Sequence, residues 1–148
     1  MTTVRELLKD RADKGIWALT PDMTVLDALK AMAKHNVGAM PVLEDGCLVG
    51  VYSERDYARN VVVKGLYAND TPLREAMVRD VVTVTLDETL EDCMRLMSEK
   101  HIRHLPVVEA CQLVGHFSIR DLMQWFIDQQ KHKIDHLQNY IEGSGYGR

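Results

Sequence analysis

Two pairs of residues carry the most specific chemistry in the chain. Ser53 is followed three residues later by Asp56, and Ser118 is followed in the same way by Asp121, with an arginine directly before each aspartate. An ionised carboxylate only accepts hydrogen bonds and can accept from both hydroxyls of a ribose. A serine at a helix start adds a hydroxyl, and the unpaired backbone N–H groups there favour a phosphate. The residue types therefore fit a nucleotide ligand.

The same residues also have a structural use. Serine is a favourable helix cap, and an aspartate in the first turn compensates the helix dipole. Either pair alone would be read in this way, but the repetition at equal spacing favours a binding role for at least one of them. Arg55, Arg59 and Arg120 are further phosphate candidates, with exposed salt bridges as the alternative for Arg55 and Arg120.

An internal repeat positions both pairs. Residues 16–57 align without a gap on residues 81–122, at an offset of 65, with 14 identities in 42 positions. Many of the other aligned positions exchange one apolar residue for another, as at Val37/Ile102 and Tyr52/Phe117, so the pattern of burial repeats as well. Residues 4–8 also resemble residues 73–77. The chain is therefore two copies of one unit with a C-terminal extension.

Each copy predicts the order β-α-β-β-α, which makes the fold class α+β with small sheets. Thr24 and Thr89 are predicted N-caps of helices of about three turns. Gly46 takes a positive φ easily whereas its counterpart Cys111 does not, so we expect the two hairpin turns to differ. The predicted strands are residues 17–19 and 82–84, followed by the hairpins 39–52 and 105–117, and a second helix begins at Ser53 and at Ser118.

The boundaries follow from this pattern. We expect a first repeat with an N-terminal helix over residues 1–64, a linker over 65–72 and a second repeat over 73–127. Residues 128–148 form a helical extension and tail. Along the last helix a heptad-like spacing favours either packing within the chain or contact with another subunit. Its positions are Met123, Ile127, Gln130, Ile134, Leu137 and Ile141.

Composition excludes several classes of function. The 148 residues carry 18 basic and 22 acidic side chains, a net charge of −4, which argues against nucleic acid as a partner. No apolar run approaches the roughly 20 residues that span a bilayer, and the N-terminus lacks a signal peptide. We therefore expect a cytoplasmic protein without a membrane partner. Cys47, Cys93 and Cys111 show no C-x-x-C spacing and are predicted to be reduced thiols.

Neither a metal site nor catalysis is predicted. His132 and His136 stand four residues apart and could share a metal ion, but without a third ligand nearby a solvated helix face is the better interpretation. The sequence lacks a glycine-rich phosphate loop, a nucleophile elbow and a zinc-protease motif. We expect no catalytic residues, no metal and no obligatory cofactor.

The sequence as a whole resembles a known family. The duplicated unit, with Pro41-Val42 and Pro106-Val107 on its second strand, looks like a tandem pair of cystathionine β-synthase (CBS) domains, also called a Bateman module. The pattern Gly-x-x-Ser-x-Arg-Asp, which ends at Asp56 and again at Asp121, carries the resemblance. It covers about residues 3–127. Stand-alone bacterial CBS pairs, which carry no attached enzyme, are similar in their long last helix.

The resemblance implies two repeats packed sheet to sheet about a pseudo-two-fold axis, with two clefts that bind adenosine compounds such as AMP, ADP, ATP, NAD(H) or S-adenosylmethionine. Each cleft would take its aspartate from one repeat and its adenine-binding backbone from the other. The first cleft would contain Ile16, Val37, Gly38, Ala39, Pro41, Ser118 and Asp121. The second would contain Ser53, Asp56, Val81, Ile102, Arg103, His104 and Pro106.

The clefts differ in ways that suggest separate roles. Gly38 and Ala39 are small enough for the backbone to approach a purine, whereas Arg103 and His104 could meet phosphates. The resulting hypothesis is a non-catalytic sensor module that binds an adenosine nucleotide and signals through homodimer geometry or an effector protein. The alternative is a constitutive interaction and dimerisation module without ligand sensing.

Overall fold

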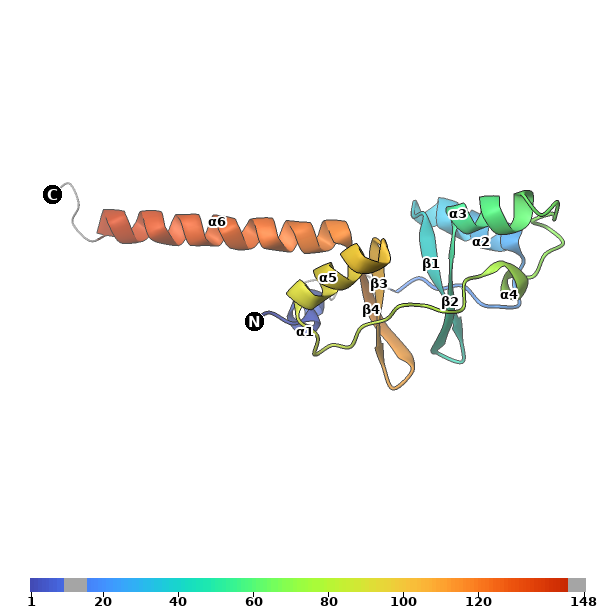
Figure 1. Cartoon of the computed structure of the whole chain (residues 1–148), viewed down its shortest axis with the longest axis horizontal. Coiled ribbons are helices and arrows are strands. Elements are labelled where there is room, and N and C mark those ends of the chain that lie inside the picture. Colours follow the sequence, from blue (N-terminus) through green and yellow to red (C-terminus); the bar gives the residue numbers. More distant parts are fainter. Residues whose placement is uncertain (10–15, 144–148) are drawn as a thin grey trace.

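The computed structural model describes residues 1–9 and 16–143, which form two similar halves and one long projecting helix (Figure 1). Each half contains a helix, a β-hairpin and a second helix, as the repeat predicts. The first half contains α2 (Val25–His35), β1 (Ala39–Glu44), β2 (Cys47–Ser53), α3 (Glu54–Tyr57) and the π-helical turn η1 (Ala58–Val62). The second contains α5 (Leu90–Lys100), β3 (His104–Glu109), β4 (Gln112–Ser118) and α6 (Ile119–Gly143).

Helices α2 and α5 begin and end alike in the two halves. The Thr24 hydroxyl accepts a hydrogen bond from the backbone N–H three residues on, at 3.1 Å, and Thr89 does the same at 3.2 Å. At the other end Asn36 and His101 adopt the left-handed conformation, with φ of 54° and 55°. Both predicted caps are therefore present, and they set the length of each helix at 11 residues.

The two hairpins join into one four-stranded sheet in the order β1-β2-β4-β3. Strands β2 and β4 meet at one register pair, Cys47 with Gln112. The predicted strands at 17–19 and 82–84 are shorter than expected, because they reduce to the isolated parallel bridges of Leu19 with Val42 and of Val84 with Val107. Proline has no N–H to donate, so Pro41, to which Leu19 donates, cannot extend the ladder.

The prediction that the two hairpin turns differ is wrong. Asp45 and Gly46 have φ of 53° and 83°, and their counterparts Ala110 and Cys111 have φ of 49° and 64°. Positive φ at both central residues is the requirement of a type I′ turn, a two-residue loop whose twist matches that of the strands. The hairpin register therefore imposes the left-handed conformation on Ala110 and Cys111, although neither residue favours it.

The short lead-in helices exchange places between the halves. Helix α1 (Val4–Lys9) precedes the first repeat in sequence but packs into the core of the second, where Val4 N–H donates to the Glu88 carbonyl at 2.9 Å. Helix α4 (Leu73–Ala76) packs into the core of the first repeat, with Leu73 N–H donating to the Met23 carbonyl at 2.8 Å. Each core is thus completed by the lead-in that the alignment assigns to the other copy.

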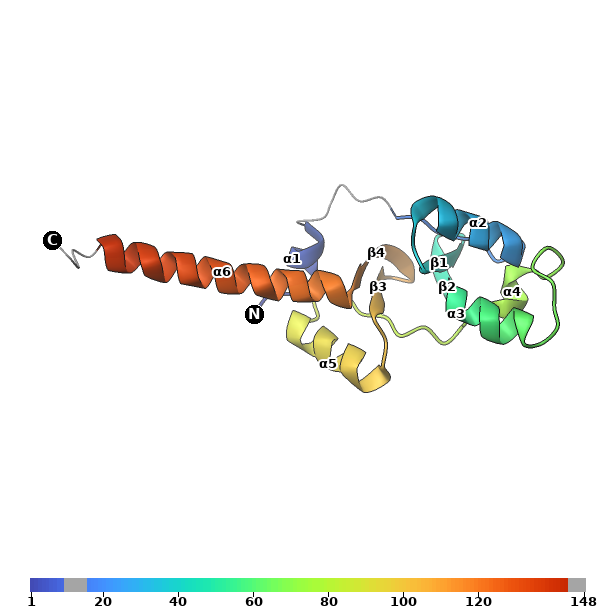
Figure 2. The same cartoon turned by 90° about the horizontal axis from the view of Figure 1, so that it is seen from above.

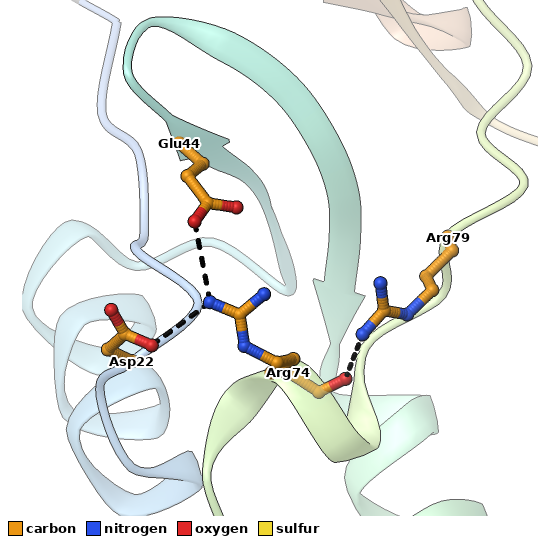
Figure 3. Close-up of polar contacts among 4 residues, drawn as sticks. All are labelled: Asp22, Glu44, Arg74 and Arg79. Carbon is orange, nitrogen blue, oxygen red and sulfur yellow. Dashed lines mark hydrogen bonds and ion pairs between the residues drawn. The ribbon is translucent and has the colours of Figure 1, made fainter.

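Surface ion pairs accompany this exchange. Arg74 Nη2 lies 3.0 Å from Asp22 Oδ1 and 3.5 Å from Glu44 Oε1, and Arg79 donates to the Arg74 carbonyl at 3.2 Å (Figure 3). The hydrogen bonds to Asp22 and then to Glu44 raise the pKa of Arg74. An equivalent pair joins Arg5 to an aspartate of the second repeat. Because these pairs are exposed, they orient the lead-ins more than they stabilise them.

The largest buried side chains of the two cores occupy equivalent positions, Tyr52 and Phe117, both fully buried. The Tyr52 hydroxyl has no hydrogen-bond partner among the described residues. Burial, and then the charge of Asp56, raises the pKa of Tyr52 to about 12. The second repeat avoids the cost of this unpaired hydroxyl by using phenylalanine.

We expect Tyr52→Phe to leave the free energy of unfolding at pH 7 unchanged or to raise it by up to about 1 kcal/mol, because the buried hydroxyl is unpaired. Above pH 10 the unfolded tyrosine ionises while the buried one stays neutral, so the native protein loses stability as pH rises toward 12. Urea unfolding between pH 8 and 11 should show the two proteins diverging above pH 10. Parallel pH curves would contradict this account of Tyr52.

The prediction of three reduced thiols is wrong for two of them. Cys47 and Cys111 form a disulfide, with their Cα atoms 5.1 Å apart, and it joins the two hairpin ends. That separation lies within the range disulfides require. The sequence could not show it, because the pair is made by the meeting of β2 with β4 and not by any local spacing. Cys93 remains a free thiol, and burial raises its pKa to about 12.

Thiol titration checks this assignment directly. The protein unfolded in denaturant without a reductant should expose one thiol per chain, Cys93, and three after reduction. In the folded state at pH 8 Cys93 should be alkylated far more slowly than a free cysteine, because little of it is thiolate. Three reactive thiols before reduction would contradict the disulfide.

Candidate functional site

A cavity of about 290 Å³ lies between the two halves and is lined by residues of both. Its first side comes from the strand β1, the end of β2 and the start of α3. Its second side comes from residues 78–82, from Ile102 between α5 and β3, and from β3 and β4. Nine of the residues expected from the sequence line it: Val37, Ala39, Pro41, Ser53, Asp56, Val81, Ile102, His104 and Pro106.

Other expected residues lie outside this lining. Six of the seven residues expected in the second cleft line the cavity, and the exception is Arg103. Of the first cleft, Ile16, Gly38, Ser118 and Asp121 do not line it. The phosphate candidates Arg55, Arg59 and Arg120 also lie outside it.

Gly38 and Arg103 each accept a backbone hydrogen bond from the first residue of a helix. The Gly38 carbonyl accepts from Glu54 N–H at 3.0 Å, and the Arg103 carbonyl accepts from Ile119 N–H at 2.8 Å. These equivalent bonds tie the strand entry of each repeat to the start of its second helix. The adenine hypothesis for Gly38 and the phosphate hypothesis for Arg103 therefore concern residues that do not line this cavity.

Ser53 and Asp56 form a capping box at the cavity wall. Asp56 Oδ2 accepts from Ser53 N–H at 3.0 Å and from the Ser53 hydroxyl at 2.8 Å, and Ser53 Oγ accepts from Asp56 N–H at 3.1 Å. These bonds fix the carboxylate against the start of α3. Within the described ranges Asp56 Oδ1 accepts no hydrogen bond. The structural and binding interpretations of this pair are thus compatible, since one oxygen caps the helix and the other can receive a ligand.

Ser118 and Asp121 repeat the same geometry at the start of α6. Asp121 Oδ2 accepts from Ser118 N–H at 2.7 Å and from its hydroxyl at 3.0 Å. Their neighbour in the cavity is His104, which pairs with Ser118 across the hairpin. Burial lowers the pKa of His104, the charge of Asp121 opposes this shift, and Arg103 adds to it. His104 is therefore neutral at pH 7 and can donate one hydrogen bond and accept another.

Seven residues of the lining were not expected from the sequence. Trp17, from the segment before α2, lines the cavity and stacks on His35 at a centroid distance of 4.1 Å. Asp80 and His116 add polar groups to the wall. Trp17 could have been found as an aromatic residue next to Ile16, which was expected in a cleft, whereas nothing in the sequence around Asp80 pointed to a cavity. Further missed residues are Met40, Val51, Val78 and Val82.

Metal and membrane sites receive no support. Among the described residues no group of three or more histidine, cysteine, aspartate or glutamate side chains could hold a metal ion. His132 and His136 are both exposed on α6. None of the helices within residues 1–9 and 16–143 is long and apolar enough to span a bilayer.

The fold and cavity define a class, that of tandem-repeat modules with a small-molecule site between two copies of one unit. The sequence profile of the CBS domain matches residues 4–63 and 73–128, so this chain belongs to the CBS domain family. CBS domain pairs are regulatory modules, and the matched profile is not that of an enzyme. The resemblance expected from the sequence is confirmed.

Relatives and solved structures agree with this placement. The mitochondrial CBS domain-containing protein CBSX3 of Arabidopsis thaliana is 33% identical over 154 residues, covering 98% of this chain and 74% of its own. The crystal structure of the CBS domain protein NE2398 is 39% identical, with a TM-score of 0.77, over 85% of this chain and 98% of its own. The CBS pair of MJ0100, solved with 5′-methylthioadenosine and S-adenosyl-L-methionine, is 26% identical with a TM-score of 0.73, over 87% and 98% of the two chains.

Proposed function

We propose that this chain is a regulatory module that binds an adenosine-containing small molecule in the cavity between its repeats. One observation carries the proposal. Asp56, held by its capping box with one carboxylate oxygen available, faces a cavity whose walls come from both repeats. The MJ0100 pair, with adenosine compounds bound, supports the ligand class.

The wall chemistry suits the parts of such a ligand. A ribose would donate its hydroxyls to Asp56 Oδ1. The purine would lie among apolar side chains, of which Val37, Ala39 and Ile102 are the expected ones and Trp17 offers an aromatic face. His104 would donate a hydrogen bond to a phosphate or another distal group. The candidates are AMP, ADP, ATP, NAD(H) and S-adenosylmethionine.

A ligand bound to both halves would signal by changing how they are held together. It must bind one arrangement of the repeats more tightly than another, and this difference in affinity sets how far the population shifts. The readout would be the geometry of a homodimer or a docking surface for an effector protein. The remaining residues of the first expected cleft, Ile16, Gly38, Ser118 and Asp121, would form a separate site.

A thermal-shift screen tests the proposal. AMP, ATP, NADH and S-adenosylmethionine are added separately to the full chain, and at least one should raise the midpoint of unfolding by mass action. A ligand at 100 times its dissociation constant stabilises the folded protein by about 2.7 kcal/mol. No shift with any of the four would overturn ligand binding and favour the constitutive interaction module.

A further inference from the structure

Helix α6 extends well beyond the part of the chain that forms the CBS repeats. The family profile ends at residue 128, whereas α6 continues to Gly143. The extra 15 residues add about 20 Å at 1.5 Å per residue. Both views show this part projecting from the body with no other described element beside it (Figures 1 and 2).

One face of this helix is apolar and exposed. We call it the α6 seam and define it as Met123, Ile127, Gln130, Ile134 and Leu137. Its four apolar members have exposed fractions of 53%, 47%, 54% and 59%. Their spacing alternates four and three residues, which is the repeat of a two-stranded coiled coil. A solvated helix would be polar all round, so the seam indicates a partner surface.

The seam is rigidly attached to the second repeat. Leu122 is fully buried, and the neighbouring Trp125 and Phe126 pack against the same core. The seam lies on a different side of α6, since Met123 and Ile127 follow Leu122 and Phe126 by one residue and therefore by about 100°. The core contacts thus fix the direction in which the seam points.

We propose that the α6 seam pairs in parallel with the same seam of a second copy of this chain, as a short two-stranded coiled coil. In heptad notation Ile127 and Ile134 are a positions, and Met123, Gln130 and Leu137 are d positions. In parallel coiled coils isoleucine at a favours two strands when leucine stands at d, and here isoleucine stands at both a positions and leucine at one of the three d positions. These side chains suit a second helix with the same seam.

Gln130 selects the parallel direction. In a parallel pair identical residues lie at the same height, so Gln130 meets Gln130 of the second copy and their amides can hydrogen-bond. In an antiparallel pair with every layer in contact Gln130 would face Ile134 of the second copy. Burying an amide against a hydrocarbon side chain without a partner is unfavourable, so the antiparallel pair loses stability.

The charges beside the seam select the same direction. Lys131 and Lys133 occupy the flanking e and g positions. In the antiparallel pair Lys131 would lie near Lys131 of the second copy, and Lys133 near Lys133 of the second copy. Like charges at such positions repel. In the parallel pair Lys133 lies next to Gln138 of the second copy, and Lys131 next to Phe126, so the repulsion is absent. The proposal does not depend on ligand binding in the cavity.

Cross-linking of the full chain tests both partner and direction. Leu137→Cys is treated with a short bismaleimide, and Asn139→Cys, on the opposite face of the same turn, is the matched control. Leu137 is 59% exposed, so its replacement should not disturb folding. The native chain measures the background cross-linking, which should be low because Cys93 is buried and Cys47 and Cys111 form a disulfide.

We expect Leu137→Cys to give a covalent dimer at least about five times more efficiently than Asn139→Cys, since a parallel pair places the two Leu137 positions together. In the antiparallel pair they would lie about 15 Å apart along the axis and would not be linked. Equal or absent cross-linking overturns the proposal. Either result would mean that the α6 seam binds a different protein or pairs with a second copy in the antiparallel direction.

Sedimentation provides a second, independent readout. Ile134→Asp places a charge in the seam, and His132→Asp places the same charge on the outer face. We expect Ile134→Asp to raise the dissociation constant of the dimer at least about tenfold over that of His132→Asp. Identical dissociation constants, or a native chain that is monomeric at every concentration, would also overturn the proposal.

Discussion

Asp56→Ala should abolish most of the affinity for whichever adenosine compound gives the largest thermal shift. One hydrogen bond to a charged group contributes about 1.5–3 kcal/mol, so the loss of even one should raise the dissociation constant by at least about 10- to 150-fold. The loss arises because the two ribose hydroxyls would lose their only ionised acceptor in this wall of the cavity. Isothermal titration calorimetry at 25 °C measures it directly.

Asp121→Ala is the matched control for this substitution. Both variants lose the two equivalent hydrogen bonds that the aspartate Oδ2 accepts from the capping serine, so the cost in stability should be similar in the two repeats. Of the two substituted aspartates, only Asp56 lines the described cavity. Asp121→Ala should therefore bind nearly as the native chain does. If Asp121→Ala lost binding while Asp56→Ala kept it, the ligand would occupy the other proposed cleft.

Gly50→Ala should destabilise the chain more than the equivalent change at Gly115. A Cβ on Gly50 would lie 2.8 Å from the Val78 carbonyl oxygen and 2.9 Å from Met77 Sδ. The backbone there cannot retreat, because Val51 and Val78 exchange two hydrogen bonds of 2.9 and 3.0 Å. We expect the free energy of unfolding to fall by about 1–3 kcal/mol, the usual cost of overpacking.

The second repeat supplies the comparison. At Gly115 the added Cβ would meet the Leu8 side chain, 2.7 Å from its Cδ1, and the flexible end of that side chain can rotate away. At Gly38 nothing lies within 4 Å. Urea unfolding of the three Gly→Ala variants should rank Gly50 as the most costly. Equal costs at Gly50 and Gly115 would contradict the close approach of residues 77–78 to β2.

The repeat and its elements could be predicted because their signals are local. Thr24 and Thr89 cap helices whose apolar spacing is visible in the sequence, and the hairpins follow from short strands separated by turn residues. The turn at Ala110 and Cys111 could not be predicted, because strand pairing overrides the preference of the two residues. Local propensity therefore gives the order of the elements but not every backbone conformation.

The arrangement of the repeats was harder to predict, because duplication makes two partners equivalent. Helix α1 resembles the lead-in of the second repeat, and nothing local shows that it completes the core of that repeat. The disulfide between Cys47 and Cys111 likewise depends on the meeting of the two hairpin ends. Contacts between segments far apart in the chain leave no trace in periodicity.

In the candidate site, too, some residues could be recognised from the local sequence and others could not. Ser53 and Asp56 could be singled out from residue type and spacing, and Ile102 and His104 followed from the family resemblance. Trp17 and Asp80 could not, because they reach the cavity only through tertiary placement. The arginines expected to meet a phosphate lie outside the lining, since a charge near a motif in sequence need not point toward the same cavity.

The central claim is that an adenosine group binds between the repeats, and methyl NMR tests it most directly. The full chain, labelled at isoleucine and valine methyls, is titrated with adenosine, the group that all the candidate ligands share. We predict saturable shifts at the cavity methyls and none on the projecting part of α6, at Ile134. The cavity methyls belong to Val37, Val51, Val78, Val81, Val82 and Ile102. Unshifted cavity methyls at millimolar adenosine, or shifts confined to other residues, would contradict the account.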